Sequence, residues 1–483
     1  MFRHVAVPLV TALVAGCAIG PDYRRPDVTA PQAFRYEPQQ VADTIDTEWW
    51  KQFNDPVLDQ LIAEALAGNK TVKIAVANVE QAAGLLTQTR APLFPQLNYQ
   101  AAAARQRSSK LSATPLPSSI PNPTNVYQLG GAASWEIDLW GRVCRLSEAA
   151  QANLLATEEA RRGVILSLVA QVATTYIQLR GLDEQLAIAQ RTLEAYKTSV
   201  DLFKLQFQYG QTSELTVAQA ESRYEAAAAE IPQIRAQIVQ TEIALSILLG
   251  RDPGPIARGK SVLELTLPTV PAGLPSQLLQ RRPDLLQAEQ QLVAANAQIG
   301  AARALYFPNI SLTGSLGTLS TAFSDLFKSD TNTWNYTGSV IGPIFTAGAI
   351  SGQVEQAKAG QKAALLSYQL AVQTAFGDVE GALWSREQLI EQVAAQERRV
   401  KALTVYRERA QELFDGGYTS YVTVLQAEQE LFPEELNLAT FRAQLFVSLV
   451  NIYRAMAGGW VDAADKLTAA SAAAKAGESG SPH

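Results

Sequence analysis

Apolar residues recur at every seventh position along a long stretch without proline, from Arg142 to Tyr209. These positions are Ile165, Val172, Leu179, Leu186, Leu193, Val200 and Phe207, and further apolar residues follow three places after most of them. Such a heptad pattern predicts a long helix that packs along another helix in a left-handed supercoil. At about 1.5 Å per residue this helix would be on the order of 100 Å long, longer than an ordinary globular core requires.

The chain contains a second copy of this region. Residues 209–221 (YGQTSELTVAQAE) align with residues 416–428 (GGYTSYVTVLQAE), and residues 90–98 align with residues 303–311. Similarity at a fixed spacing indicates structural repeats, so the sequence predicts two repeats within one elongated body rather than several independent domains.

The heptad pattern is weaker in the second copy, where Arg386 and Arg407 interrupt it. The apolar positions that remain are Val372, Val379, Val393, Val400 and Phe414. We expect repeat 1 at residues 49–250, with a helix-pair tip near 209–213, and repeat 2 at residues 283–460, with a tip near 416–420. Residues 251–282 are predicted to form an equatorial connector between the repeats.

The hydrophobic period changes to two ahead of each long helix. Asn309, Ser311, Thr313 and Ser315 alternate with apolar neighbours and Gly314, and residues 96–101 show a similar pattern. Period two predicts strands with one polar and one apolar face. Return strands are predicted at 127–139 and 334–345, which gives two β-hairpins at about 95–140 and about 307–346.

The two hairpins carry residues that could form an aromatic girdle at a membrane interface: Tyr99, Tyr127, Trp135, Trp334 and Tyr336. After residue 17 no apolar run reaches the length of about 18 residues that a membrane-spanning helix needs. A barrel is possible, but four strands cannot close one, because about eight strands is the smallest number seen. We therefore expect several subunits to pool their strands.

The first residues have the layout of a secretory signal, with a basic start, an apolar run from Val5 to Ala15, and small residues before Cys17. A small-residue run ending in cysteine resembles the bacterial lipoprotein box, in which the cysteine becomes the acylated N-terminus. We expect a signal peptide at 1–16 and lipidation of Cys17; a plain signal peptide with an incidental cysteine is the alternative. Residues 17–48 are predicted to form an extended lipidated segment, and 461–483 a flexible tail.

Composition narrows the possible functions. Hydrophobic residues make up 47% of the 483-residue chain and charged residues 18%, which excludes a disordered chain, and the net charge of −6 offers no basic surface for nucleic acid. The two histidines, His4 and His483, lie at the ends, which argues against imidazole catalysis and histidine metal sites. We expect neither enzymatic activity nor a cofactor.

Five motifs in chain order resemble those of the outer-membrane efflux proteins, the TolC-like family, in the lipoprotein branch that includes NodT and OprM. They are Cys17 with Gly20-Pro-Asp-Tyr23, Trp49-Trp50 with Phe53 and Asp55-Pro56, Trp135-Glu-Ile-Asp-Leu-Trp-Gly-Arg142, Arg281-Arg-Pro-Asp284, and Phe307-Pro308. Each motif alone is weak, but their order and spacing are specific. The resemblance covers about Cys17 to Gly459.

The resemblance implies a mainly α-helical homotrimer with a twelve-stranded membrane β-barrel, four strands from each subunit, continued by a helical tunnel through the periplasm. It implies a lipid-anchored location in the bacterial outer membrane, with a periplasmic adaptor (membrane fusion) protein and an inner-membrane efflux pump as partners. Family members are passive exit ducts for drugs, dyes or other small molecules. They perform no chemistry, need no cofactor and take their energy from the pump.

The resemblance also implies two candidate sites. The helical turns would be the periplasmic tips that meet the adaptor, and they consist of Gly210, Gln211, Thr212, Ser213, Gly417, Tyr418, Thr419 and Ser420. The same residue types suit ordinary helix-hairpin turns, and both roles can hold at once.

The second candidate site is the periplasmic aperture. In the family, the helix after the second tip often carries aspartates that narrow the closed aperture, and the matching positions here are Thr423 and Gln426. Thr423, Gln426 and Glu430 share a helix face. We therefore hypothesise an aperture at these three residues, with the constricting carboxylate displaced to Glu430. The alternative is that Glu430 only contacts solvent and neutral contacts hold the gate.

Two other functions stay open. A duct for protein secretion is the alternative within the same class of protein. A periplasmic coiled-coil adaptor lipoprotein would explain the heptads and the lipid anchor, but not two matching polar and apolar hairpins in two repeats.

Overall fold

The structure is a computed structural model that describes residues 19–28, 31–36, 48–109, 121–268, 270, 275–457, 460–466 and 468. Cys17 and the predicted signal peptide lie outside the described residues, as do residues 469–483 of the predicted tail. The described chain divides into two compact units. Unit 1 consists of Met1–Asp27, Asn78–Thr157 and Ala288–Tyr368, and unit 2 of Val28–Ala77, Glu158–Gln287 and Gln369–His483.

The helices follow the predicted repeats. The long helices are α4 (Arg142–Gln208) and α8 (Ala349–Asp415), and each is followed by a shorter partner, α5 (Glu214–Leu249) or α9 (Tyr421–Met456). The remaining α-helices are α2 (Pro56–Gly68), α3 (Lys70–Arg90), α6 (Pro275–Arg281) and α7 (Pro283–Ala304). Short 3-10 helices are η1 (Trp49–Phe53), η2 (Ala91–Leu93), η3 (Phe323–Asp325) and η4 (Ser329–Thr331).

The long helix that the heptad pattern predicts is confirmed as α4, which ends one residue earlier than expected. Ile165, Val172 and Leu179 are fully buried, as a heptad seam requires. Helix α6, by contrast, lies in the predicted connector and was not expected from the sequence. Within the described residues, no helix is both long enough and apolar enough to cross a membrane.

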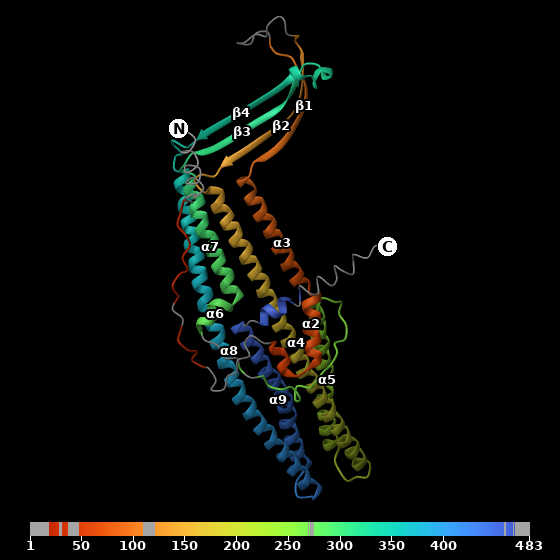
Figure 1. Ribbon diagram of the computed structural model, residues 1–483. Coiled ribbons are helices and arrows are strands. Elements are labelled where there is room, and N and C mark those ends of the chain that lie inside the picture. Colours follow the sequence, from red (N-terminus) through yellow and green to blue (C-terminus); the bar gives the residue numbers. More distant parts are fainter. Residues whose placement is uncertain are drawn as a thin grey trace. The chain divides into compact units, whose positions relative to one another are not determined.

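A four-stranded antiparallel sheet dominates unit 1. Its strands are β1 (Gln96–Gln106), β2 (Thr124–Ile137), β3 (Asn309–Ser320) and β4 (Asn332–Ile341), in the order β1-β2-β3-β4 (Figure 1). Both predicted hairpins are therefore present. The pairing of β2 with β3, from Tyr127↔Ser320 to Ile137↔Ile310, joins the two repeats in one sheet.

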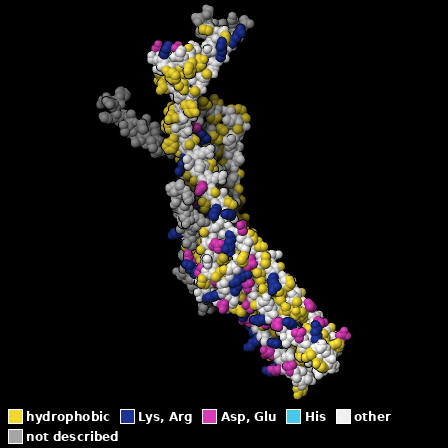
Figure 2. Space-filling view, turned by 90° about the vertical axis from the view of Figure 1, so that its right-hand side faces the viewer, with side chains coloured by type: hydrophobic (Ala, Val, Ile, Leu, Met, Phe, Trp, Pro, Cys, Tyr) yellow, Lys and Arg dark blue, Asp and Glu magenta, His cyan; other side chains and the backbone are white. Residues whose placement is uncertain are grey.

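The sheet has one polar and one apolar face, as the period of two predicts. On one face the cross-strand neighbours are apolar, for example Leu316 opposite Trp334, whereas Ser315 opposite Asn335 lies on the other. The apolar face is exposed in the single chain: Tyr99 is 90% accessible and Tyr336 is 80% accessible. Figure 2 likewise shows apolar side chains gathered over the sheet. A water-facing sheet would not be expected to expose such a face.

Strand β4 ends earlier than predicted. The sequence predicts the return strand to extend to Phe345, but the structure ends it at Ile341. Gly342-Pro343 follows, and proline has no backbone N–H to donate to a ladder. The apolar residues Ile344 and Phe345 are highly exposed and belong to the turn that leads into α8.

The motif from Trp135 to Arg142 makes the turn from β2 into α4. The Trp140 ring stacks on the Phe307 ring at a centroid distance of 4.7 Å, and its Nε1–H donates to the Pro308 carbonyl at 2.7 Å. Arg142 holds Glu136 with two hydrogen bonds of 2.8 and 3.0 Å. Two of the motifs noted in the sequence therefore pack on each other where strands give way to helices.

The core of unit 2 is aromatic at its centre. Trp49 stacks on Tyr453 at 5.2 Å and meets Trp460 edge to face, and Phe53 packs against Phe446. These contacts join η1 to α9 and to Trp460, which explains the Trp49-Trp50 and Phe53 motif. The cluster buries apolar area, the main favourable term in folding.

The predicted flexible tail needs one correction. Residues 460–466 form a helical segment, and Trp460, Val461 and Ala464 are buried in the core of unit 2. The carboxylate of Asp465 pairs with Arg161 through hydrogen bonds of 2.7 and 2.8 Å. The alanine-rich composition suggested a tail, but these contacts hold the start of the 461–483 segment in place.

Candidate functional site at the helical tips

Both helix-pair tips end their long helix in the same way. At the first tip, Gly210 has a φ of +69°, its N–H donates to the Phe207 carbonyl at 2.9 Å, and the Gln211 N–H donates to the Gln206 carbonyl at 2.8 Å. At the second tip, Gly417 has a φ of +74° and the same two bonds recur one repeat later. This is a Schellman C-cap, in which glycine accepts the left-handed conformation without a Cβ penalty.

The tips differ in how the second helix of each pair begins. Ser213 caps α5 by accepting a hydrogen bond from the Thr216 N–H at 3.4 Å. Ser420, at the equivalent place before α9, makes no such side-chain bond within the described residues. Instead the Thr419 and Thr423 hydroxyls hydrogen-bond to each other at 2.9 Å. The predicted tip residue Thr419 and the predicted aperture residue Thr423 are thus brought together.

Most of the predicted tip residues are exposed. Gly210, Gln211 and Ser213 at the first tip and Gly417, Tyr418 and Ser420 at the second are exposed, whereas Thr212 and Thr419 are partly buried. Tyr418 is the most prominent, because 84% of its surface is accessible. Large exposed aromatic side chains at a loop are typical of contact residues.

The two tips are packed together by an apolar cluster beneath the turns. Phe203 of α4 lies 4.1 Å from Tyr421 and 6.1 Å from Phe414, measured between ring centroids. Val200, Ala220, Val424 and Ala427 complete the buried core of the cluster, together with Ala410 and Leu425. Packing of this kind couples the position of α9 to that of α4.

The structure places the three predicted aperture residues unequally. Gln426 and Glu430 are exposed on α9, as expected for residues four apart on one face, whereas Thr423 is partly buried and bonded to Thr419. Their neighbour Gln429 hydrogen-bonds to Arg223 of α5. The role of these residues at an aperture stays a prediction.

Glu428 lies on the opposite side of α9 and was not singled out by the sequence. Its Oε2 atom is buried and has no hydrogen-bond partner among the described residues. Burial raises the pKa of Glu428 to about 7, and the positive charges of Arg407 and Arg223 only partly oppose this. The heptad interruption at Arg407 was the available signal, since a charge inside a seam calls for a partner.

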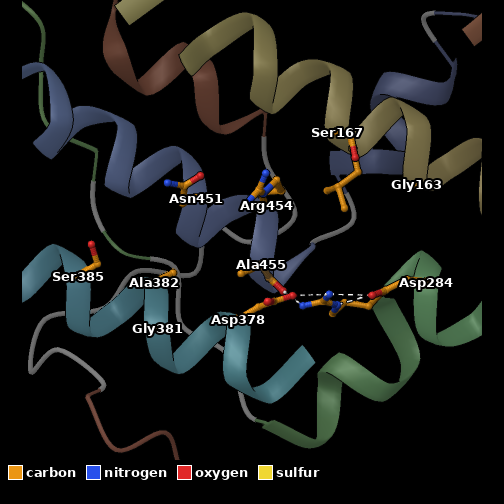
Figure 3. A pocket seen from close by; sticks show the side chains of 12 residues that line it. Gly163, Ser167, Asp284, Asp378, Gly381, Ala382, Ser385, Asn451, Arg454 and Ala455 are labelled. Atoms are coloured by element: carbon orange, nitrogen blue, oxygen red, sulfur yellow. Dashed lines mark hydrogen bonds and ion pairs between the residues drawn. The ribbon is translucent and has the colours of Figure 1, made fainter. Parts of the chain in front are cut away.

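A second charged cluster explains the motif Arg281-Arg-Pro-Asp284. The Arg282 guanidinium bonds to Asp284 at 3.0 and 2.7 Å and to Asp378 at 2.9 Å, the contacts marked by dashed lines in Figure 3. It also donates to the Ala375 and Ala455 carbonyls at 3.4 and 3.1 Å. Arg282 therefore ties the start of α7 to α8 and to the end of α9.

A cavity of about 480 Å³ lies beside this cluster, lined from α4, α7, α8 and α9 (Figure 3). Small residues line it on two helices, namely Gly163 and Ser167 of α4 and Gly381 and Ser385 of α8. Arg454 borders it from α9. Both aspartates near it already neutralise Arg282. Its groups serve to join helices, and we assign the cavity no ligand.

Asp55 belongs to the motif that begins at Trp49-Trp50. Its side chain is buried, and its role is structural. It is 0% exposed, caps α2 by accepting the Val57 N–H at 2.9 Å, and accepts the Tyr176 hydroxyl at 2.8 Å. The Lys260 N–H adds a third bond at 3.2 Å. Asp55 thereby holds the connector against α2 and α4. The sequence motif alone did not predict these contacts.

No group of three or more His, Cys, Asp or Glu side chains in the described part of the chain is arranged to hold a metal ion. The charged clusters consist of arginines with carboxylates, which satisfy each other. The arrangement as a whole provides long packed helices, two exposed tips and a sheet with an exposed apolar face.

The sequence matches a family model described as outer membrane efflux protein over residues 61–251 and 274–458. The cation efflux system protein CusC of an Escherichia coli strain is 35% identical over 462 residues, which cover 94% of this chain and 98% of CusC. The solvent efflux pump outer membrane protein SrpC of Pseudomonas putida is 36% identical over 467 residues, covering 95% of this chain and 99% of SrpC.

Solved structures have the same fold. The outer-membrane channel OprN superposes with a TM-score of 0.84 at 31% identity, covering 92% of this chain and all of the OprN chain. The open state of the Neisseria gonorrhoeae MtrE outer membrane channel gives a TM-score of 0.82 at 33% identity, covering 92% of this chain and 98% of that one.

Fold and relatives together define the class of protein, which is an outer-membrane channel. The chain belongs to the outer membrane efflux protein family, and its place is the outer membrane. The resemblance drawn from the sequence motifs is thus confirmed, as are the mainly helical fold and its two repeats. The alternative of a periplasmic adaptor is wrong.

Proposed function

We propose that this chain is the outer-membrane channel of a tripartite efflux system and acts as a passive exit duct for small molecules. The observation that carries the proposal is the sheet, whose apolar face is exposed and whose strands lead into two long helix pairs. An exposed apolar band suits lipid, and long paired helices suit a tunnel wall. Relatives named as outer membrane proteins of efflux pumps support the same assignment.

The working unit we propose is a homotrimer with a twelve-stranded barrel. The four strands of one chain leave β1 and β4 as edges, and an edge strand presents unpaired backbone groups that lipid cannot satisfy. Pairing β1 of one copy with β4 of the next removes both edges. Native mass spectrometry of the detergent-extracted protein should find three copies, and a monomer would contradict this part of the proposal.

The partners we propose are a periplasmic adaptor protein at the tips and an inner-membrane pump beyond it. The exposed residues of both turns, with Tyr418 foremost, support a contact role for the tips. Their Schellman glycines support the structural role as well, so the two roles coexist. Cys17 lies outside the described residues, and we propose its lipidation as the anchor of the chain.

The proposed cargo is a small molecule rather than a protein. Relatives at nearly the same identity are named for efflux of cations, solvents and antibiotics, which supports small-molecule efflux but favours no single substrate. Polar side chains on the second face of the sheet suit the passage of many solutes. We propose that Thr423, Gln426 and Glu430 border the periplasmic aperture.

The two faces of β4 allow a matched test. Changing Trp334 and Tyr336 to lysine places charge on the proposed lipid face, which costs between about 0–1 kcal/mol per residue near an interface and about 2–4 kcal/mol near the bilayer midplane. The control changes Asn335 and Thr337, the polar-face neighbours on the same strand, to lysine. Both proteins are expressed in a cell that lacks its own efflux channel but contains the adaptor and pump.

We expect the control to reach the outer-membrane fraction and to lower the accumulation of a fluorescent dye, as the unchanged protein does. The Trp334→Lys, Tyr336→Lys protein should be lost from that fraction, and dye should accumulate. Equal behaviour of the two variants would contradict lipid contact by the apolar face. Failure of the unchanged protein to lower dye accumulation while it is present in the outer membrane would contradict the duct itself.

A further inference from the structure

Glu428 occupies an unusual position between helices beneath the second tip. A cavity of about 170 Å³ lies between α4, α8 and α9, and Glu428 borders it. One carboxylate oxygen is buried there without a hydrogen-bond partner in the described residues, and so is the Nε atom of Arg407. Two buried polar groups left without partners at one cavity form a polar network that is not fully satisfied, which is costly.

Charged and titratable groups face this place from every element packed around it. They are Arg191 and Tyr196 on α4, Arg223 on α5, Arg407 on α8, and Tyr421 and Glu435 on α9. Burial raises the pKa of Glu435, and the charges of Arg191 and Arg407 oppose the shift. Burial also raises the pKa of Tyr421 to about 12 and that of Tyr196 further still, so both phenols stay neutral.

The other repeat provides an internal reference. Glu221 occupies the position equivalent to Glu428 in the shared Gln-Ala-Glu segment, but 46% of its side chain is accessible and its carboxylate pairs with Lys204 at 2.8 Å. The position equivalent to Arg407 is Val200, a buried member of the tip cluster. The carboxylate therefore has an ion-pair partner in repeat 1, whereas in repeat 2 one of its oxygens is buried beside a cavity without a hydrogen-bond partner among the described residues.

The sign of the effect follows from the burial of Glu428. Because the pKa is about 7 in the packed helices and 4.5 in the ordinary exposed group, the packed state holds its proton where an exposed carboxyl has lost it. The packing is therefore most stable below about pH 4.5 and loses stability as pH rises through about 7. Above that value the buried carboxylate favours any opening that admits water.

Glu428 and the proposed aperture share one helix. Glu430 follows two residues later, and at 3.6 residues per turn the two side chains lie on opposite faces of α9. Glu430 is exposed while Glu428 faces the cavity. A shift of α9 away from α4 and α8 would thus move the face that carries Gln426 and Glu430.

We propose that Glu428 is a proton-operated latch of the second tip: its neutral form holds α9 against α4 and α8, and its ionised form releases it. Arg407 moderates the latch, because its charge favours the ionised form without forming an ion pair in the described structure. The latch controls how often the proposed aperture opens.

The first test is hydrogen exchange of the full-length protein, which does not depend on the proposed function. Peptides covering residues 421–435 are compared at about pH 6 and about pH 8 after correction for intrinsic exchange chemistry, in the wild type, in Glu428→Gln and in Glu221→Gln. We expect local opening in the wild type to increase about tenfold over this range, since one pH unit corresponds to tenfold for a single titrating proton.

Glu428→Gln keeps the shape of the neutral acid, so its opening should be independent of pH and smaller than that of the wild type at both pH values, because the wild type is fully protonated in both states only below about pH 4.5. Glu221→Gln, changed in the same segment of the other repeat, should behave like the wild type. A wild type without pH dependence, or a Glu428→Gln protein that retains it, would overturn the latch, whether or not the protein conducts.

The second test rests on the proposed function and measures single-channel openings in a planar bilayer across the same pH range. We expect openings of the wild type and of Glu221→Gln to become more frequent as pH rises, and those of Glu428→Gln to be less frequent and independent of pH. Openings that respond to pH equally in all three proteins would overturn the proposal that the latch controls the aperture.

Discussion

The two repeats align residue by residue along their long helices, yet their seams are built from different chemistry. Leu179 and Val200 of α4 are buried in apolar clusters, whereas the equivalent positions of α8 are Arg386 and Arg407. The Nε atoms of both arginines are buried and without hydrogen-bond partners among the described residues. Burial alone lowers the pKa of Arg386, which indicates that no nearby carboxylate compensates for its desolvation.

The seam of repeat 1 is filled by apolar side chains at these positions, whereas the seam of repeat 2 contains buried arginine atoms whose hydrogen bonds are not made within the described residues. An apolar seam is best packed in one arrangement, because close-packed side chains tolerate little displacement. Buried charges whose hydrogen bonds are incomplete are stabilised when water reaches them. The packing of such a seam therefore opens at a lower cost in free energy. We infer that repeat 1 provides the fixed part of the tip and that repeat 2 provides the part that moves.

The largest effect should come from giving the seam of repeat 1 the chemistry of repeat 2. Leu179→Arg buries a charge without a partner and should destabilise the fold by about 3–5 kcal/mol. Thermal unfolding of the purified protein and its yield in the outer membrane measure this loss. The reciprocal variant, Arg386→Leu, should unfold at the same temperature or higher, and similar losses in both variants would remove the distinction between the seams.

The C-caps should behave alike in the two repeats. Gly210→Ala and Gly417→Ala each force a side chain into the left-handed conformation, which costs about 1–2 kcal/mol. Hydrogen exchange at each turn should report nearly equal losses of protection. Gly377→Ala, in the interior of α8 where a Cβ meets open space, is the control and should not loosen the helix. Unequal losses at the two tips would mean that their geometry differs more than the hydrogen bonds indicate.

The N-caps should produce the smallest effect and a clear asymmetry. Ser213→Ala removes a capping bond and should cost about 1 kcal/mol in the stability of the first turn of α5. Ser420→Ala removes no capping bond, so the start of α9 should change little. The comparison is made by hydrogen exchange of peptides that begin at each turn. A larger effect at Ser420 would argue that α9 is as firmly capped as α5.

Local pattern was enough to predict the long helices and the strands of this fold, but it missed the short helix α6. A heptad seam specifies helix α4 nearly to its last residue, and alternation in residues 309–316 specifies β3, because both signals lie within one element. The pairing of β2 with β3 was not predicted, since it joins strands far apart in the chain. Residues 461–466 were predicted to begin a tail because of their composition, but Val461 and Ala464 are buried in the core of unit 2.

The candidate site was predicted only in part. The tips could be located because glycine followed by Thr-Ser recurs in both repeats, and their exposure agrees with a contact role. Glu428 could not be recognised, because its counterpart Glu221 ends the same Gln-Ala-Glu segment and forms an ion pair with Lys204. Whether such a carboxylate is buried depends on which helices surround it, and that is a property of the packing.

The most direct test of a channel opened by repeat 2 is single-channel conductance in a planar bilayer. Gln426→Gly with Glu430→Gly alters the proposed aperture, and Thr216→Gly with Gln219→Gly alters the corresponding face of α5 in repeat 1 while keeping Arg223, which bonds to α9; each glycine costs a helix about 1 kcal/mol. We expect the wild type and the repeat 1 variant to be mostly closed and the repeat 2 variant to conduct freely. Free conduction by both variants, or by neither while the protein is folded and inserted, would contradict this division between a fixed and a moving repeat.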